Sequence, residues 1–313
     1  MIDLVVLVGP TAAGKSDLGA ALATRLGGEV ISADAFAVYR GLDIGTAKPS
    51  PELRRLVPHH LIDVADPRER YSAGTFVRDA DAAIAAVRAR GRAPVIVGGT
   101  LFYVRALLFG LFPEPAKNLE LRAWLEQAWE RQPGRLRAWL DLHDPAAAAR
   151  IAAADRQRTL RALEVCLAGG APMTAQWRSH RRDTPRYRFL MLGVRLGRPA
   201  LHARIALRVE AMFEAGLVDE VRGLIAGGVP LGAHALKAIG YRECLEVVGG
   251  RLSVAQAREA TVQATRQLAK RQLSWLRGEA DLAWVDGGGE SGVAQAVALA
   301  EASGGTGTRA AKG

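Results

Sequence analysis

Residues 9–16 read GPTAAGKS, and this short stretch decides the fold class. It matches the pattern GxxxxGK[ST] and stands between an apolar run at 4–8 and a helical pattern at 15–26. A strand, a glycine-rich loop and a helix in this order are the context of a phosphate-binding loop (P-loop). Such a loop offers backbone amides to an anion, to which Lys15 adds a charge and Ser16 a hydroxyl that can hold Mg²⁺.

Further along the chain, short apolar runs alternate with helical patterns. The runs that we expect to be buried strands are 30–32, 60–64, 94–97, 189–194 and 282–285. This alternation predicts an α/β fold with a parallel, P-loop NTPase-like sheet covered on both faces. Ser72 is expected to cap a helix that runs to Arg90, and Ser253 to cap a long helix that ends before Gly278.

The strand signal vanishes between Pro113 and Pro185, where Ala, Leu, Arg and Trp recur with helical periodicity. We therefore expect a helical insert at 113–185 within a P-loop core made of 1–112 and 186–301. The remainder, 302–313, is small and polar, and it predicts a disordered tail.

The composition limits the classes of protein. With 313 residues and 49% hydrophobic content the chain can bury a large core, and its apolar runs are too short to predict a membrane span. Because no apolar leader opens the chain, we expect a cytoplasmic protein, and we expect a monomer. The net charge of +10 is typical of a protein with a polyanionic partner. Cys166 and Cys244 have no metal-ligand spacing, so we interpret both as core residues.

Asp34 is the most informative acidic residue. It follows an apolar run within ISADAFAVYRGLDIGTAKP at 31–49, where it could be a magnesium ligand, a catalytic base or the cap of a turn. A P-loop protein that hydrolyses nucleotides would carry a metal-binding Asp at the end of a later strand, but the run at 94–97 continues into Gly98, Gly99 and Thr100. The glycines let a ligand approach the backbone, and Thr100 either binds that ligand or caps a helix. Asp63 is the competing strand-end carboxylate, and a structural role for it is equally compatible with the sequence.

Several motifs together resemble the tRNA dimethylallyltransferases, also called tRNA isopentenyltransferases. In that family's order and spacing the chain carries GPTAAGKS, ISADAFAVYRGLDIGTAKP, PHHLID, YSAGTF, VGGT, LEVCLAGG, GYRE and TRQLAKRQLSWLRG. The resemblance runs from about residue 4 to residue 285. It implies transfer of a dimethylallyl group from dimethylallyl diphosphate to the exocyclic N6 amine of the adenosine 3′-adjacent to the tRNA anticodon.

The resemblance assigns roles in the chemistry to particular residues. Asp34 would remove a proton from the adenine amine, Thr100 would bind the diphosphate near its leaving oxygen, and Mg²⁺ on Ser16 would help to neutralise it. Arg208 stands where the family carries a diphosphate-binding arginine, although it could equally be a solvated helix charge. The loop residues expected to bind the diphosphate, or a nucleotide such as ATP, are Gly9, Pro10, Thr11, Ala12, Ala13, Gly14, Lys15 and Ser16.

The tRNA anticodon stem-loop is the partner that the resemblance implies, and the target base must leave its stack to react. The alternative for the basic residues among the expected contacts is an ordinary solvated surface. The expected contacts are Asp34, Ala35, Phe36, Ala37, Thr100, Arg122, Gln157, Arg158, Arg161, Lys237, Gly240, Tyr241, Arg242, Arg266, Lys270 and Arg271.

The chain departs from the family in two places. Ala35 stands where a hydroxyl residue is usual, so a hydrogen bond that could orient Asp34 is missing or supplied elsewhere. The segment 150–155 reads RIAAAD in place of RIHPND, which removes polar groups from a region expected to recognise the RNA loop.

Three other functions remain open at this point. A small-molecule P-loop kinase would explain the loop but would leave the insert and the basic long helix without a task. A transferase that prenylates free adenine nucleotides would not need the insert. A non-catalytic P-loop RNA-binding protein would leave Asp34 and Thr100 without a task.

Overall fold

The computed structural model describes residues 2–111, 118–180, 184–287 and 289–304. The chain divides into two compact units. The P-loop unit comprises Met1–Leu108 with Arg186–Gly313, and the helical insert comprises Phe109–Pro185. The insert thus begins four residues before the expected position 113. Of the predicted tail 302–313, Ala302 is the last residue of a helix, and residues 305–313 lie outside the described residues.

The core of the P-loop unit is a six-stranded sheet in which every pair of neighbouring strands is parallel. The strand order is β3-β2-β4-β1-β5-β6, so β1 lies inside the sheet. The predicted parallel α/β class is confirmed. The strands are β1 (Leu4–Val8), β2 (Gly28–Ser32), β3 (His59–His60), β4 (Ala93–Gly98), β5 (Phe189–Arg195) and β6 (Leu282–Asp286).

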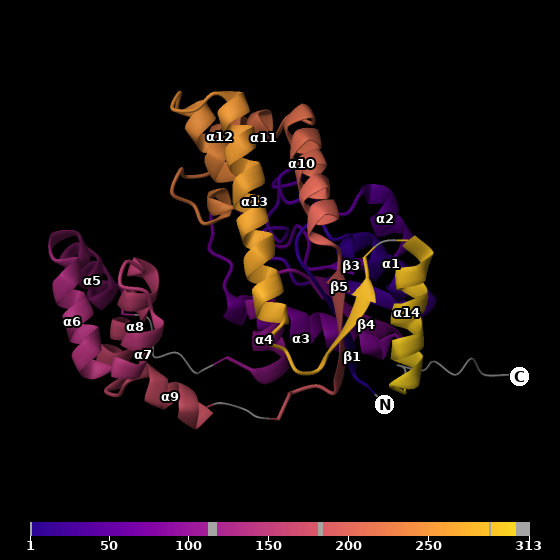
Figure 1. Cartoon of the computed structure of the whole chain (residues 1–313), viewed down its shortest axis with the longest axis horizontal. Helices are drawn as coiled ribbons and strands as arrows, with labels where there is room; N and C mark the ends of the chain where they lie inside the picture. Colours follow the sequence, from indigo (N-terminus) through magenta and orange to yellow (C-terminus); the bar gives the residue numbers. More distant parts are fainter. Residues whose placement is uncertain (1, 112–117, 181–183, 288, 305–313) are drawn as a thin grey trace, which may run out of the picture. The chain divides into compact units, whose positions relative to one another are not determined.

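Helices cover both faces of this sheet (Figure 1). The crossover from β1 to β2 and the crossover from β2 to β4 run in opposite directions along the sheet. Because both are right-handed in parallel sheets, their helices α1 (Lys15–Arg25) and α3 (Ala73–Ala89) lie on opposite faces. The other helices of this unit are α2 (Pro51–Leu56), α4 (Leu101–Phe109), α10 (Arg198–Glu214), α11 (Leu217–Ala226), α12 (Tyr241–Val248), α13 (Val254–Leu276), α14 (Gly289–Ala302) and the 3₁₀ helix η1 (Ala235–Lys237).

Both predicted helix caps are confirmed. The Ser72 hydroxyl accepts a hydrogen bond from the Thr75 amide at the start of α3, and the Ser253 hydroxyl accepts one from the Gln256 amide at the start of α13. Each bond satisfies one of the free amides of a first helical turn.

The strand predicted at 60–64 is wrong beyond its first residue. Leu61 and Asp63 adopt φ angles of 61° and 60°, which no extended strand contains. The segment instead turns back, and the Asp63 amide donates to the carbonyl of Ala37 while the Ala65 amide donates to that of Val38. A short apolar run next to the sheet edge had suggested a longer strand than the backbone forms.

Within its described residues, the helical insert contains five helices and no strand. Its core contains Leu125, Leu136, Leu140, Leu160 and Leu163, all of which are buried. The helices are α5 (Leu119–Arg131), α6 (Pro133–His143), α7 (Pro145–Arg150), α8 (Arg156–Gly169) and α9 (Met173–His180).

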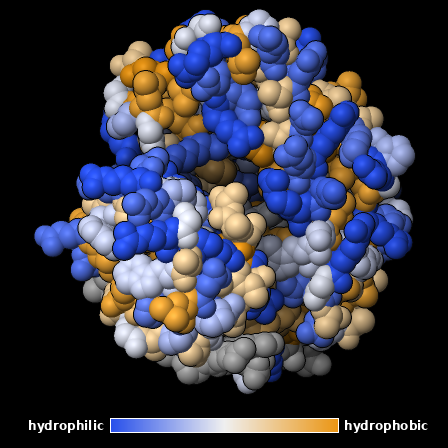
Figure 2. Space-filling view, turned by 60° about the vertical axis from the view of Figure 1, so that its left-hand side comes forward, coloured by the Kyte–Doolittle hydropathy of each residue, from blue (hydrophilic) through white to orange (hydrophobic). Residues whose placement is uncertain are grey.

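The surface is consistent with the composition. Hydrophilic residues predominate on the face drawn in Figure 2, with hydrophobic residues in smaller groups between them. Among the described residues, no helix combines the length and the apolar character that crossing a bilayer requires.

Candidate active site

The residues expected to take part in the chemistry lie where the sheet strands end. The P-loop follows β1, Asp34 follows β2, Thr100 follows β4, and the arginines of α10 follow β5. The carboxyl ends of parallel strands meet at one edge of a sheet, where open α/β proteins bind their ligands. The parallel topology therefore brings together four segments that are far apart in the sequence.

The lysine of the P-loop forms a hydrogen bond within the loop. The Lys15 ammonium donates a hydrogen bond of 2.7 Å to the carbonyl of Pro10. Gly14 precedes α1 with a φ of 89°, which favours glycine. The loop therefore presents the first turn of α1, with its free backbone amides, to a ligand.

Two cationic side chains, those of Lys15 and Arg208, lie close together at this loop. Burial, and then repulsion from Arg208, lower the pKa of Lys15 to about 7, while Asp34 acts in the opposite direction. Burial also lowers the pKa of Arg208, again opposed by Asp34. Arg208 forms no hydrogen bond or ion pair within the part of the chain that the structure describes, which favours the interpretation of Arg208 as an anion-binding residue over a solvated charge. An anion bound between Lys15 and Arg208 would stabilise both positive charges and raise both pKa values.

A cavity of about 560 Å³ opens at the P-loop. Arg204 was missed at the sequence level, although it lies one helical turn before Arg208 on α10 and its guanidinium lies beside Gly14. The cavity is lined by Ala12, Gly14, Lys15, Ser16, Asp17, Ala47, Lys48, Pro49, Ser50, Glu52, Leu53, Leu56, Arg204 and Arg208.

Asp34 has one oxygen held and one oxygen available. Its Oδ1 accepts hydrogen bonds from the amides of Phe36 (2.8 Å) and Ala37 (3.0 Å), so the turn-capping interpretation is correct for this atom. Oδ2 accepts no hydrogen bond from any described residue. The carboxylate is therefore oriented by backbone amides and keeps an acceptor for a proton.

Thr100 holds the backbone at Ala35, whose own side chain cannot form a hydrogen bond. The Thr100 hydroxyl accepts a hydrogen bond of 3.1 Å from the Ala35 amide, and its own hydrogen stays available for donation. Thr100 also precedes α4, and its carbonyl accepts from the amides of Tyr103 and Val104. Asp34 is therefore oriented even though position 35 has no hydroxyl, because the Phe36 and Ala37 amides hold its Oδ1.

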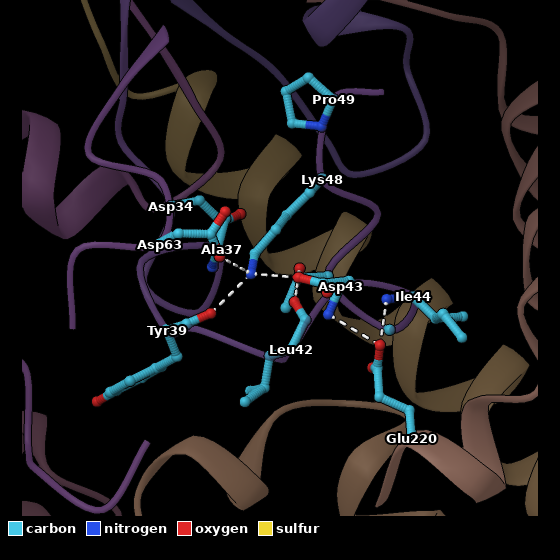
Figure 3. A network of polar contacts seen from close by, with 12 residues as sticks. Asp34, Ala37, Tyr39, Leu42, Asp43, Ile44, Lys48, Pro49, Asp63 and Glu220 are labelled. Carbon is cyan, nitrogen blue, oxygen red and sulfur yellow. Dashed lines mark hydrogen bonds and ion pairs between the residues drawn. The ribbon is translucent and has the colours of Figure 1, made fainter. Parts of the chain in front are cut away.

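Lys48, for which no sequence motif predicted a role, holds the segment that follows Asp34 (Figure 3). Its side chain is only 3% exposed, and its ammonium donates to Asp43, to Asp63 and to the carbonyl of Tyr39. Asp63 also accepts from Arg54 at 2.8 Å, which establishes the structural interpretation of Asp63. The available signal was the presence of a lysine at this position in a chain where only six of 42 basic residues are lysine.

The same segment is tied to α11 and α12. Glu220 accepts from the amides of Asp43 (3.0 Å) and Ile44 (2.9 Å), as Figure 3 shows, and also from the Tyr241 hydroxyl. Tyr241 is completely buried. Its side chain consequently has no surface for RNA, and we correct the expected tRNA contact to a structural role.

The other residues expected to contact RNA near Tyr241 differ in exposure. Lys237 is exposed and has no hydrogen bond or ion pair among the described residues. Arg242 pairs with Glu243, and Gly240 is buried with a φ of 94°. The Phe36 ring stacks on the ring of His234, with 5.7 Å between centroids, beside Asp34.

The long helix α13 exposes the three cations that were predicted to contact RNA. Arg266, Lys270 and Arg271 are exposed, and none forms a hydrogen bond or ion pair with a described residue. Their charges are therefore available to a polyanion.

In the insert, the predicted RNA contacts are gathered on two helices. Glu164 pairs with Arg122 of α5 (3.5 Å) and with Arg161 of α8 (2.9 Å). Arg158 pairs with Asp155, and Gln157 beside it is exposed. The insert thus brings Arg122 and Arg161 together around one acidic side chain.

The comparisons with known proteins agree on one family. The model described as IPP transferase matches residues 37–279, and the one described as isopentenyl transferase matches residues 2–63. The tRNA dimethylallyltransferase of Koribacter versatilis is 45% identical over 288 residues, which cover 92% of this chain and 94% of that protein.

Solved structures show the same relationship. The tRNA isopentenylpyrophosphate transferase of Bacillus halodurans aligns with a TM-score of 0.70 at 36% identity and covers 96% of this chain and 95% of that one. A eukaryotic dimethylallyltransferase, described as acting on tRNA, aligns with a TM-score of 0.82 at 25% identity and covers 96% of this chain and 80% of that one. The chain belongs to the IPP transferase family.

Proposed function

We propose that this protein transfers a dimethylallyl group from dimethylallyl diphosphate to the N6 amine of the adenosine 3′-adjacent to the anticodon of tRNA. One observation carries the proposal. The carboxylate of Asp34 has a free oxygen and lies close enough to Lys15 and Arg208 to shift the pKa of both. The proposed base thus lies near the cations of the proposed anion site.

The P-loop stabilises the leaving group in this reaction. Lys15, Arg208 and the amides at the start of α1 take up negative charge as the allylic carbon–oxygen bond breaks and diphosphate departs. The organic group moves, and the phosphates stay on the loop. The Thr100 hydroxyl, which accepts from Ala35, has its hydrogen free to donate to the diphosphate.

Asp34 acts on the nucleophile. The lone pair of an adenine amine is delocalised into the ring, so attack on the allylic carbon is helped by removal of an amine proton. Oδ2 of Asp34 accepts that proton, while Oδ1 stays fixed by the Phe36 and Ala37 amides. The new carbon–nitrogen bond replaces the carbon–oxygen bond.

The donor set at the P-loop fits Mg²⁺. Among the described residues there is no group of three or more His, Cys, Asp or Glu side chains that could hold a metal ion. Mg²⁺ bound to a phosphate substrate commonly uses only one or two protein oxygens together with phosphate and water. Ser16 offers such an oxygen at the start of α1, and the ion would supply charge neutralisation on the diphosphate.

Cations that are exposed or half-buried provide the RNA-binding surface of this proposal. In the P-loop unit these are Lys237, Arg266, Lys270 and Arg271, and in the insert the corresponding residues are Arg122, Arg158 and Arg161. Phosphate contacts of this kind position a nucleic acid without reading its sequence. Since tRNA is the proposed substrate, we expect the protein to act in the cytoplasm.

A single transfer assay tests the function. Radiolabelled dimethylallyl diphosphate and Mg²⁺ are offered with a tRNA that has adenosine 3′ to its anticodon, with the same tRNA carrying guanosine there, or with AMP. Label should appear only in the first RNA. Label on AMP would instead support a nucleotide prenyltransferase, and ATP-dependent phosphorylation of a small alcohol without prenyl transfer would support a kinase.

A further inference from the structure

The side chain of Gln272 lies between two loops of the candidate site. On α13, Ala269, Gln272 and Leu276 are buried, and Gln272 itself is only 8% exposed. Its Oε1 accepts a hydrogen bond of 2.8 Å from the Thr11 amide of the P-loop, and its Nε2 donates one of 2.8 Å to the carbonyl of Gly99. One carboxamide thus joins the loop after β1 to the loop after β4.

Each of the two polar atoms of the Gln272 carboxamide has a partner that requires that type of atom. The Thr11 amide requires an acceptor and the Gly99 carbonyl requires a donor, and a carboxamide offers the two on one carbon. Position 99 is adapted to this contact, because a Cβ there would lie 2.6 Å from Nε2 of Gln272. The absence of a side chain at Gly99 is therefore what allows Gln272 to reach the loop.

Each loop also has a support of its own. Lys15 donates to the Pro10 carbonyl within the P-loop, and the Thr100 amide donates to the Ala33 carbonyl at the end of β2. Loss of Gln272 would leave these bonds in place. What it would remove is the direct connection between the leaving-group loop and the Gly99–Thr100 segment, which in turn holds the Ala35 amide beside Asp34.

We propose that Gln272 is a positioning residue for prenyl transfer, which sets the distance between the diphosphate on the P-loop and the base Asp34. This inference rests on the proposed function. Because each loop keeps its own fold, both substrates still bind when Gln272 is replaced, but the reacting atoms are misplaced. A displacement of about 1 Å can cost roughly 10²-fold in rate.

The first test separates turnover from binding. Gln272→Met retains the length of the side chain and removes both hydrogen bonds. We expect kcat to fall by about 10- to 100-fold, while KM for dimethylallyl diphosphate and for tRNA changes less than about threefold. Gln263→Leu, at an exposed position of the same helix without a hydrogen bond to a described residue, is the matched control and should behave as the wild type.

The second test uses pH as a readout that packing alone would not move. In Gln272→Glu the carboxylate still accepts from Thr11, but it repels the Gly99 carbonyl unless it is protonated. The kcat of Gln272→Glu relative to Gln272→Met should therefore rise as the pH falls from about 8.5 to about 6. A kcat of Gln272→Glu equal to that of the wild type across this range would contradict the positioning role, because a carboxylate cannot donate to the Gly99 carbonyl.

The outcomes are distinguishable from a failure of the proposed function. A wild-type protein that transfers no prenyl group refutes that function, whereas an active wild type with an equally active Gln272→Met refutes only the inference. Thermal unfolding establishes whether each variant is folded. If Gln272→Met does not fold, Gly99→Ala displaces Nε2 with Gln272 intact and should lower kcat similarly; wild-type kcat in Gly99→Ala would overturn the proposal.

Discussion

The polar residues around the candidate active site and the predicted RNA contacts of the helical insert are held in different ways. In the P-loop unit, Lys48 and Asp63 form hydrogen bonds to partners nine to 15 residues away, and Gln272 bonds to residues 173 and 261 positions away. In the insert, Arg122 and Arg158 pair on the surface with acids that are mostly three or four residues away. Surface pairs of this kind contribute only about 0–1 kcal/mol. Among these residues, those around the candidate active site are therefore held more firmly than the predicted RNA contacts of the insert.

The largest effect should follow from Asp34→Asn. The amide oxygen can still accept from Phe36 and Ala37, but asparagine cannot remove a proton, so the single-turnover rate should fall by about 10²- to 10⁴-fold. Affinity for tRNA and its salt dependence should stay near the wild-type values. Asp219→Asn, at an exposed surface pair with Arg222, is the control. An unchanged rate for Asp34→Asn would show that Asp34 is not the base. The contrast between the P-loop unit and the insert would then lose its catalytic meaning.

Lys15→Met should affect binding as well as rate. The pKa of Lys15 is about 7 in the free site, and a bound diphosphate favours the charged form and raises it. Affinity should therefore be highest below pH 7 and decline above it, where binding must take up a proton. Calorimetry in buffers of different ionisation enthalpy at pH 8 measures this uptake. The wild type should exceed Lys15→Met in protons bound, and equal uptake would show that Lys15 does not face the diphosphate.

Asp144→Ala should destabilise the insert alone. Asp144 is buried, accepts from the Ala147 amide at the start of α7, and accepts twice from Thr174. Its loss leaves buried donors unsatisfied, which costs about 1–3 kcal/mol. Hydrogen exchange should accelerate within Phe109–Pro185 while β1 and β4 stay protected. Equal acceleration in both units would show that they unfold together and would weaken the contrast between them.

The smallest effects should come from the charges that we expect to contact RNA, where free and paired cations can be compared. Each neutral substitution at Arg266, Lys270 or Arg271 should reduce the slope of log affinity against log salt by about 0.7–0.9, because these cations have no partner among the described residues. Arg122→Gln and Arg158→Gln should change the slope less, because Glu126, Glu164 and Asp155 already compensate these charges. Salt titrations of tRNA binding measure both sets. Equal slopes for the wild type and the triple α13 variant would place the RNA elsewhere.

Much of the site was predictable because its signals are local. GPTAAGKS between an apolar run and a helical pattern predicted the loop, and Asp34 and Thr100 each follow a strand that the sequence identified. The helix caps Ser72 and Ser253 were also readable, because each bond reaches only three residues. Tyr241 and the strand at 60–64 misled the prediction, because burial and left-handed backbone conformations depend on what packs against a segment.

The sequence by itself determined most of the order of strands and helices and the P-loop motif, since periodicity, glycine placement and capping act over a few residues. The proposal of Asp34 as the base came from the resemblance to the family. Only the tertiary structure decided how these parts are held. Gln272 meets Thr11 across 261 residues and Gly99 across 173, and Glu220 meets Asp43 across 177. No local pattern encodes such pairs, because parallel strands and their crossover helices determine which distant residues come within hydrogen-bonding distance.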